Sequence, residues 1–143
     1  MRILFDTNVI LDVLLDREPF SSKAAELFSL VESGELSGFV CATTITTLHY
    51  LARKVIGKES ATKEIAKLMM LFEVATVNRP VLNAALSSKF NDFEDAVVHE
   101  AALYQGAQGI VTRDFTGFKK SKINVYRPEE LLLMLESKNT SAD

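Results

Sequence analysis

The chain has 143 residues, of which 48% are hydrophobic and 24% charged, and its formal net charge is −3. A chain of this length is expected to form one compact domain with a substantial buried core. The small negative charge argues against a protein that holds nucleic acid through bulk electrostatics alone, because such domains are usually basic. Local basic patches remain compatible with it.

Targeting and redox features are few. The single cysteine, Cys41, cannot form an internal disulfide, which fits a reducing compartment. Asp6 and Asp12 interrupt the apolar N-terminal stretch, so we expect no secretion signal. No uninterrupted apolar run approaches the roughly 20 residues that a membrane-spanning helix needs. The sequence therefore predicts a cytoplasmic protein that does not enter a membrane.

Short apolar segments alternate with longer segments of helical periodicity. The predicted strands are RILF at 2–5, GFVCA at 38–42, EVATV at 73–77, QGIVTRD at 108–114 and a short strand at 123–126. The predicted helices are 6–16, 21–35, 43–57, 58–72, 78–88, 91–107 and a C-terminal helix that ends near 136. Strands that alternate with helices predict an α/β fold, with a central parallel sheet of four to five strands and helices on both faces.

Local signals place some boundaries. Pro80 falls in a first helical turn, where proline is favoured. Asn91 and Glu94 have the spacing of a capping box, and Gly106 is a stop signal for the same helix. We expect one domain over residues 1–136 and a disordered polar tail over 137–143.

Carboxylates gather at one predicted edge of the sheet. Asp6 follows the first strand, Asp114 follows the fourth, and Asp92 and Asp95 lie at the start of a helix that can face the same edge. Ligands of parallel α/β sheets bind outside the carboxyl ends of the strands. The four acids therefore form a candidate site.

Each acid also has a structural explanation of its own. Asp6 can cap a helix, an interpretation that stands beside the site interpretation. Asp92 and Glu94 suit a first helical turn, and Asp114 suits a turn before Gly117. Their joint placement is not explained in this way, because carboxylates at close range repel each other unless a cation lies between them. Oxygen ligands of this kind suit Mg²⁺ or Mn²⁺.

Other chemistry is less well supported. His49 and His99 have no zinc-ligand spacing, and we expect His99, in the middle of a helix, to be solvent-facing or to have its hydrogen bonds satisfied. Cys41 is expected to be a small core residue. The residues DTN stand after the first strand where a nucleotide-binding fold would carry glycines. Basic residues after the fourth strand are candidates for holding a phosphate backbone beside the acids. They are Arg113, Lys119, Lys120 and Lys122.

Three stretches together resemble the PIN-domain family. They are ILFDTNVILD near the N-terminus, FNDFEDAVVHEAA in the third quarter and GIVTRDFTGFKKSKINVYRPEELL near the end. The resemblance covers nearly the whole chain in the right order, and any one stretch alone would be weak. It implies a Rossmann-like parallel sheet and a metal-dependent ribonuclease that cuts single-stranded or loop RNA. Many members are toxins that an antitoxin protein inhibits, and small members commonly form homodimers.

The resemblance also assigns residues. Asp6, Asp95 and Asp114 match the three acids that hold Mg²⁺ or Mn²⁺, and Asn8 and Thr112 match polar positions that support them. Asp92 is a further candidate, as a catalytic residue or an orienting group.

One position departs from the family pattern. Many members carry a glutamate on the helix after the second strand, and Thr47 stands there in this chain. A threonine hydroxyl can hold a metal-bound water but supplies no charge, and Asp92 is a candidate to compensate. Two rival interpretations follow. One is a PIN-fold module that binds RNA or a protein without cutting. The other is a phosphoryl-acceptor receiver domain, which lacks a role for FEDA and fits less well.

Overall fold

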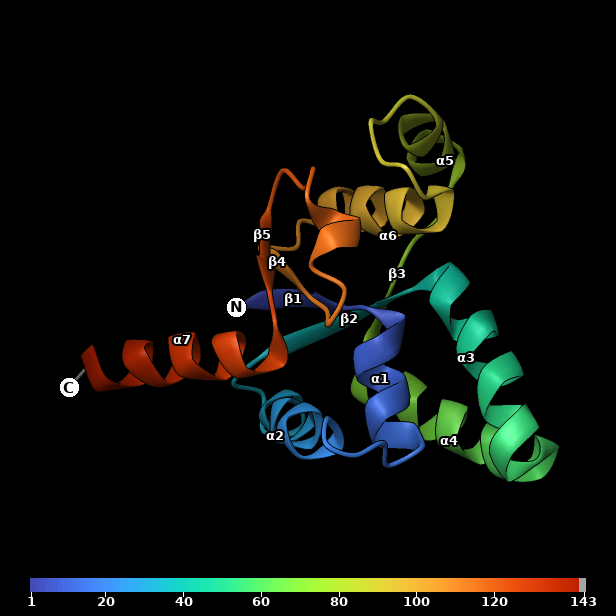
Figure 1. Cartoon of the computed structure of the whole chain (residues 1–143), viewed down its shortest axis with the longest axis vertical. Coiled ribbons are helices and arrows are strands. Elements are labelled where there is room, and N and C mark those ends of the chain that lie inside the picture. The colour runs from blue at the N-terminus through green and yellow to red at the C-terminus, as the bar shows by residue number, and fades with distance from the viewer. Residues whose placement is uncertain (142–143) are drawn as a thin grey trace.

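The computed structural model describes residues 1–141 of the chain (Figure 1). Its elements in chain order are β1 (Arg2–Phe5), α1 (Thr7–Leu14), α2 (Ser21–Glu32), β2 (Ser37–Cys41), α3 (Ala42–Ile56), α4 (Lys58–Leu71), β3 (Glu73–Ala75), α5 (Arg79–Leu86), α6 (Phe93–Tyr104), β4 (Gly109–Val111), the short 3₁₀ helix η1 (Thr116–Phe118), β5 (Asn124–Tyr126) and α7 (Pro128–Ser141). This alternation confirms the predicted α/β class.

The strands form one parallel five-stranded sheet in the order β3-β2-β1-β4-β5. The N-terminal strand β1 is therefore central, with Leu4 aligned to Phe39 of β2 on one side and to Ile110 of β4 on the other. The chain turns in opposite directions from β1, so the loops after β1 and β4 separate at the carboxyl edge of the sheet. Such a switch point is where α/β folds bind their ligands.

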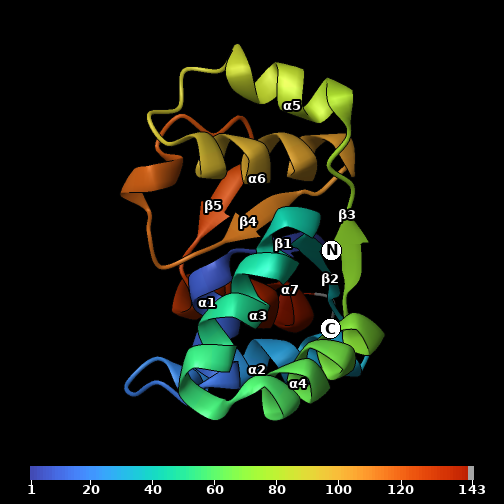
Figure 2. The same ribbon diagram turned by 90° about the vertical axis from the view of Figure 1, so that its right-hand side faces the viewer.

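Alternate side chains of β1 supply two separate cores. Ile3 and Phe5 pack with residues of α1, α2, α3, α4 and α7 on one face. Leu4 packs with α5 and α6 on the other. Figure 2 shows this arrangement, with α5 and α6 above the sheet and the other helices below it. Because β1 is buried on both faces, its sequence is a continuous apolar run without alternating polar residues.

Some boundaries differ from the predicted ones. Asp92, not Asn91, is the N-cap of α6: its side chain accepts a hydrogen bond from Asp95 N, so the predicted capping box is wrong by one residue. The two neighbouring residues have nearly equal capping propensity, and sequence alone does not separate them. β4 ends at Val111, so residues 112–114 lie beyond the strand.

The C-terminal helix is longer than predicted. Residues 137–141, which we expected in a disordered tail, form the last turns of α7, where Lys138 is favourably placed for the helix dipole. The rest of the predicted tail, 142–143, lies outside the described residues. Over the part of the chain that the structure describes, none of the helices combines the length and the apolar character required to cross a bilayer.

Candidate active site

Asp6 lies where β1 ends and α1 begins. Its backbone N–H donates to Val111 O at 3.0 Å, which continues the pairing of β1 with β4 for one residue. Its extended backbone and its side chain then cap α1, with Thr7 N donating to Oδ1 at 2.9 Å. The residue is only 7% exposed. Asp6 is therefore the N-cap of α1, and in this position its carboxylate lies at the carboxyl edge of the sheet.

Hydrogen bonds fix the orientation of this buried carboxylate. The Thr112 hydroxyl donates to Asp6 Oδ2 at 2.8 Å, and Asn8 Nδ2 donates to the same oxygen at 3.3 Å. Burial nevertheless raises the pKa of Asp6 above 3.8, and the nearby charges of Asp114 and Glu94 act in the same direction, against the hydrogen bonds from Thr112 and Thr7. Hydrogen bonds thus fix the Asp6 carboxylate in position, whereas burial makes its ionised form less favourable.

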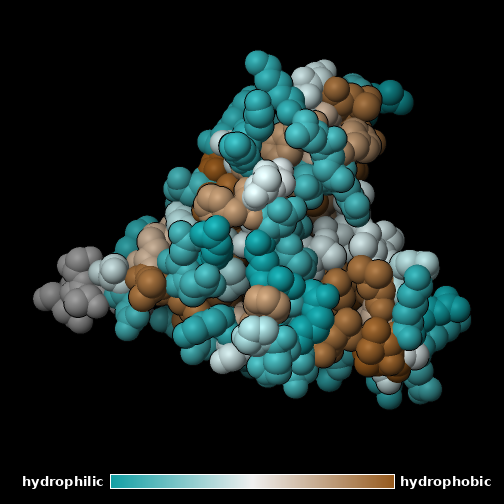
Figure 3. Space-filling view, viewed as in Figure 1, coloured by the Kyte–Doolittle hydropathy of each residue, from teal (hydrophilic) through white to brown (hydrophobic). Residues whose placement is uncertain are grey.

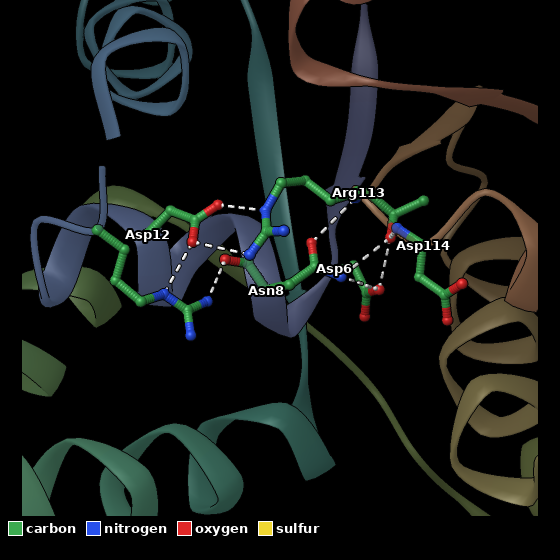
Figure 4. A network of polar contacts seen from close by, with 7 residues as sticks. Asp6, Asn8, Asp12, Arg113 and Asp114 are labelled. Atoms are coloured by element: carbon green, nitrogen blue, oxygen red, sulfur yellow. Dashed lines mark hydrogen bonds and ion pairs between the residues drawn. The ribbon is translucent and has the colours of Figure 1, made fainter. Parts of the chain in front are cut away.

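Asn8 and Thr112 connect the loops that follow β1 and β4 (Figure 4). Asn8 Oδ1 accepts the backbone N–H of Arg113 at 3.0 Å, and Asn8 Nδ2 also donates to Thr112 Oγ1 at 3.2 Å. Thr112 Oγ1 in turn accepts the backbone N–H of Asp114 at 2.9 Å. The structure therefore places both predicted supporting residues between Asp6 and Asp114.

Asp95 projects from the first turn of α6 and is half-buried. Burial raises its pKa from 3.8 to about 7, and the charges of Asp6, Asp92, Asp114 and Glu94 add to the effect. Asp92 caps α6 through Asp95 N at 2.9 Å, so one of its oxygens already has a structural partner. The electrostatics show that the acids share one environment in which a second negative charge is disfavoured.

Gly117 lies beside the carboxylates of Asp95 and Asp114, which both border the space next to its Cα. Asp114 Oδ1 accepts the Gly117 N–H at 3.1 Å. A Cβ added to Gly117 would lie 2.5 Å from Asp114 Oδ2 and 2.8 Å from Asp95 Oδ2. Both carboxylates therefore border the space that a side chain at position 117 would fill, and only glycine leaves it free.

Asp6, Asp95 and Asp114 line a single cavity of about 370 Å³. Other residues of its wall are Thr7, Asn8, Leu11, Arg17, Thr47, Glu94, Val98 and Arg113. Thr47 thus faces the site as expected, with its hydroxyl also donating to Thr43 O at 3.3 Å. A larger hollow of about 660 Å³ lies between α2 and α7, but leucine, glutamate and one lysine line it, and none of the candidate acids does.

Asp12 has a role in the site that was not predicted from the sequence. This residue is fully buried and binds two guanidinium groups. Arg113 Nε lies 2.7 Å from Asp12 Oδ2, and Arg17 Nε lies 2.8 Å from Oδ1 (Figure 4). Phe20 covers the Arg113 guanidinium, whose carbon is 3.8 Å from the ring centroid. Asp12 lies on the apolar side of a predicted helix, one turn after Asn8, and an acid in such a position indicates a buried ion pair.

The predicted RNA-binding cations have different surroundings. Asp12 holds the Arg113 guanidinium through Nε and, at 3.1 Å, through Nη2, so only part of this group can face a phosphate. Lys119 and Lys120 line a hollow of about 450 Å³ that Asp95 and Asp114 also border. Lys122 lies further away and lines a different cavity.

The donor set suits a hard divalent cation. Among the residues that the structure describes, no three side chains of Asp, Glu, His or Cys are already gathered as a closed metal site. The acids instead line an open cavity with carboxylate oxygens, the ligands that Mg²⁺ and Mn²⁺ prefer. Their mutual repulsion, expressed in the raised pKa of Asp95, is what a cation relieves. The residues therefore fit the ion chemically.

Several solved structures with this fold are toxins or toxin–antitoxin complexes. One is VapBC2 from Rickettsia felis bound to a promoter DNA fragment, with a TM-score of 0.69 and 14% identity over 89% of this chain and 98% of that one. FitAcB from Neisseria gonorrhoeae has a TM-score of 0.65 and 20% identity over 89% and 98%. VapC20 from Mycobacterium tuberculosis, a sarcin–ricin loop cleaving toxin, has a TM-score of 0.62 and 16% identity over 76% and 86%. At these identities the likeness shows the fold alone.

Sequence comparisons give the family. No curated protein matches the chain. A family model described as "PIN domain" matches residues 2–116, a span that contains Asp6, Asp95 and Asp114. That span covers most of the chain. The chain therefore belongs to the PIN-domain family.

Proposed function

We propose that this protein is a Mg²⁺- or Mn²⁺-dependent endoribonuclease that hydrolyses phosphodiester bonds in single-stranded or loop RNA. The observation that carries the proposal is the meeting of Asp6, Asp95 and Asp114, from three separate elements of a PIN domain, on the wall of one cavity. The raised pKa values of Asp6 and Asp95 support a site that is built to receive a cation.

Asp6, Asp95 and Asp114 are the residues that would hold the ion. When bound, it supplies positive charge for the phosphate oxygens and activates water for attack on phosphorus. Asn8 and Thr112 keep the Asp6 carboxylate in one orientation through their hydrogen bonds to Oδ2. Asp92 orients the first turn of α6, and with it Asp95, through its cap. Thr47 supplies an uncharged hydroxyl to the same wall.

Cations beside the acids would position the RNA backbone. Lys119 and Lys120 border the hollow next to Asp95 and Asp114, where they can neutralise phosphates on one side of the scissile bond. Arg113 borders the acidic cavity itself, in a position fixed by Asp12. Unpaired RNA suits such a site because its phosphates and bases are accessible.

We also propose that the protein is the toxin of a toxin–antitoxin pair, acts in the cytoplasm and forms a homodimer. Structural neighbours that are toxin–antitoxin complexes support the antitoxin partner. Apolar side chains exposed on α3 and α4 give surface for protein contacts: Tyr50, Val55, Met69 and Met70. Figure 3 shows an apolar patch on the side of the molecule where α1 and α3 lie.

The test is cleavage of a mixed, structured RNA with Mg²⁺ or Mn²⁺ by the wild type and by Asp95→Asn, each with and without chelator. Cleavage by the wild type that disappears with chelator and in Asp95→Asn supports the ribonuclease and its metal site together. Cleavage that survives Asp95→Asn contradicts the site assignment.

A second candidate function rests on Thr47. Because this position of the cavity wall carries no charge, the protein is alternatively a PIN-fold module that binds RNA or a protein without cutting it. Binding by the wild type with no turnover under either ion, together with cleavage gained in Thr47→Glu, would favour this alternative.

A further inference from the structure

A second cavity, of about 560 Å³, lies between α5, α6 and the segment after η1. Lys89, Lys120 and Lys122 line it, and among the described residues Glu100 is the one acid on its wall. Positive charge is therefore concentrated here in a chain whose formal net charge is −3. Figure 3 shows mainly hydrophilic surface over the α5–α6 loop and η1, in contrast to the patch near α3.

This cavity is a neighbour of the acidic site. The hollow of about 450 Å³ shares Asp95 and Asp114 with the acidic cavity. It shares Lys89, Phe90 and Lys120 with the cavity between α5 and α6. The three hollows therefore follow one another along the surface, so a strand that has one phosphate at the acids can extend over Lys89 and Lys120 toward the second cavity.

His99 lines the cavity from α6. The residue is 1% exposed, and its Nε2 accepts the backbone N–H of Lys122 at 3.0 Å. In the neutral imidazole the proton is therefore on Nδ1. Glu100 Oε1 lies 3.4 Å from Nδ1, within ion-pair range but without hydrogen-bond geometry. The imidazole is thus fixed beside the cavity, and a molecule that occupies the cavity changes its surroundings.

Phe90 gives the cavity a flat apolar wall. Its ring lies over the His99 imidazole, with centroids 4.7 Å apart and an angle of 32° between the planes. Its edge contact with Phe118, at 6.0 Å, fixes the ring from the other direction. Aromatic walls beside lysines are the elements from which single-strand binding sites are built, because they contact bases while the cations neutralise phosphates.

We infer that the cavity between α5 and α6 holds one nucleotide of the RNA strand, adjacent to the bond that the acids cleave. Lys89 and Lys122 neutralise its phosphate, and Phe90 contacts its base beside the imidazole of His99. The choice of RNA as ligand rests on the proposed function, whereas the binding site itself does not depend on catalysis.

The experiment uses a cleavage-resistant probe, a 2′-O-methyl octanucleotide of mixed sequence, in chelator. The imidazole resonances are followed by NMR. The chain has two histidines, so His49 on α3, hydrogen-bonded to Thr62 at 3.0 Å, is the internal control. We expect the His99 resonances to shift saturably on titration while those of His49 stay in place. An octanucleotide that binds without moving the His99 resonances overturns the inference, and so does one that does not bind.

Lysine variants test which residues contact the octanucleotide, with the binding affinity as the measurement. Lys89→Gln and Lys122→Gln are each expected to weaken octanucleotide binding by about threefold to tenfold and to lower the salt dependence by about one unit each. Lys63→Gln, on exposed α4, is the matched control and should leave affinity unchanged. Affinity that is unchanged in both Lys89→Gln and Lys122→Gln, or lowered equally in Lys63→Gln, contradicts the assignment.

The outcome separates this inference from the proposed function. A His99 shift with lysine-dependent binding, but no cleavage of natural RNA under either ion, supports the nucleotide site and rejects the ribonuclease. Metal-dependent cleavage supports the ribonuclease. If the His99 resonances then do not shift and the lysine variants bind with unchanged affinity, the nucleotide site is rejected.

Discussion

The Thr112 hydroxyl donates to Asp6 Oδ2 at 2.8 Å and accepts the backbone N–H of Asp114 at 2.9 Å, so one oxygen atom positions two of the three candidate ligands. Thr112 is completely buried. The loops after β1 and β4 are thereby fixed to each other at the site.

Thr112→Val removes this oxygen at nearly constant side-chain shape. We expect a loss of about 1–3 kcal/mol in the free energy of unfolding at neutral pH, because a buried carboxylate loses its strongest donor. Cleavage should fall by about tenfold or more, as is typical when a group that orients a metal ligand is removed. Denaturant unfolding and RNA cleavage measure the two effects. Thr112→Ser keeps the hydroxyl, and a Ser variant as impaired as Val would contradict the role.

Asp12→Asn tests the buried ion pair. The carboxylate is fully buried and binds both Arg17 and Arg113, so its replacement leaves two guanidinium groups without a counter-charge. We expect unfolding to become easier by about 3 kcal/mol. The matched control is Glu64→Gln, which breaks the exposed pair with Lys67 and should change stability by less than about 0.5 kcal/mol. Thermal unfolding compares them, and equal shifts would refute the structural role of Asp12.

Asp95→Asn should stabilise the metal-free protein while abolishing cleavage. The pKa of Asp95 is raised to about 7 in the folded chain, above its ordinary 3.8, so ionisation disfavours the fold. The stability that the protonated form contributes is complete below pH 3.8 and is lost as the pH rises through 7. Asn and wild type should therefore be similar near pH 4 and differ above pH 7. Because the group is half-exposed, solvent screening limits the difference to about 1 kcal/mol. Unfolding curves across this pH range provide the measurement.

Mg²⁺ or Mn²⁺ should raise the melting temperature of the wild type. An ion that binds the folded chain at a concentration 100 times its Kd adds about 2.7 kcal/mol to stability. Asp95→Asn and Asp6→Asn should lose most of this gain, whereas Glu64→Gln should retain it. Calorimetry with and without chelator makes the comparison. A wild type that gains nothing from either ion would reject the metal site independently of any activity.

Gly117→Ala should reduce cleavage with little effect on stability. The new methyl group would occupy the space that the Asp95 and Asp114 carboxylates border, so both must move. A displacement of this size at reacting groups costs on the order of tenfold to a hundredfold in rate. Thr116→Ala, on the preceding exposed residue of η1, is the matched control. Single-turnover kinetics decide, and a fully active Gly117→Ala would show that this space is not used.

The sequence predicted the fold class and the meeting of the acids for one physical reason. Strands that alternate with helices give a parallel sheet, and the carboxyl ends of parallel strands share an edge. Asp6 and Asp114 each follow a strand, so their placement required only the positions of β1 and β4. The roles of Asp6, Asp92, Asp95 and Asp114 in catalysis stay predictions.

Other features needed coordinates. Asp12 and Arg113 are 101 residues apart, and their contact depends on β4 lying next to β1, an order that the residue pattern does not specify. The space at Gly117 depends on side-chain positions at ångström scale. Of the two alternatives expected for His99, the solvent-facing one is wrong: the residue is buried, with Nε2 accepting from Lys122 N and Nδ1 beside Glu100, contacts that its spacing in the sequence does not reveal.

The central place of β1 in the sheet has a consequence during synthesis on the ribosome. The first strand made must keep one of its edges open until β4, which is made after six helices, arrives beside it. Asp6 is therefore made long before Asp114, and the two can meet only after β4 has been made and has paired with β1. Any activity that needs both carboxylates must wait for that pairing.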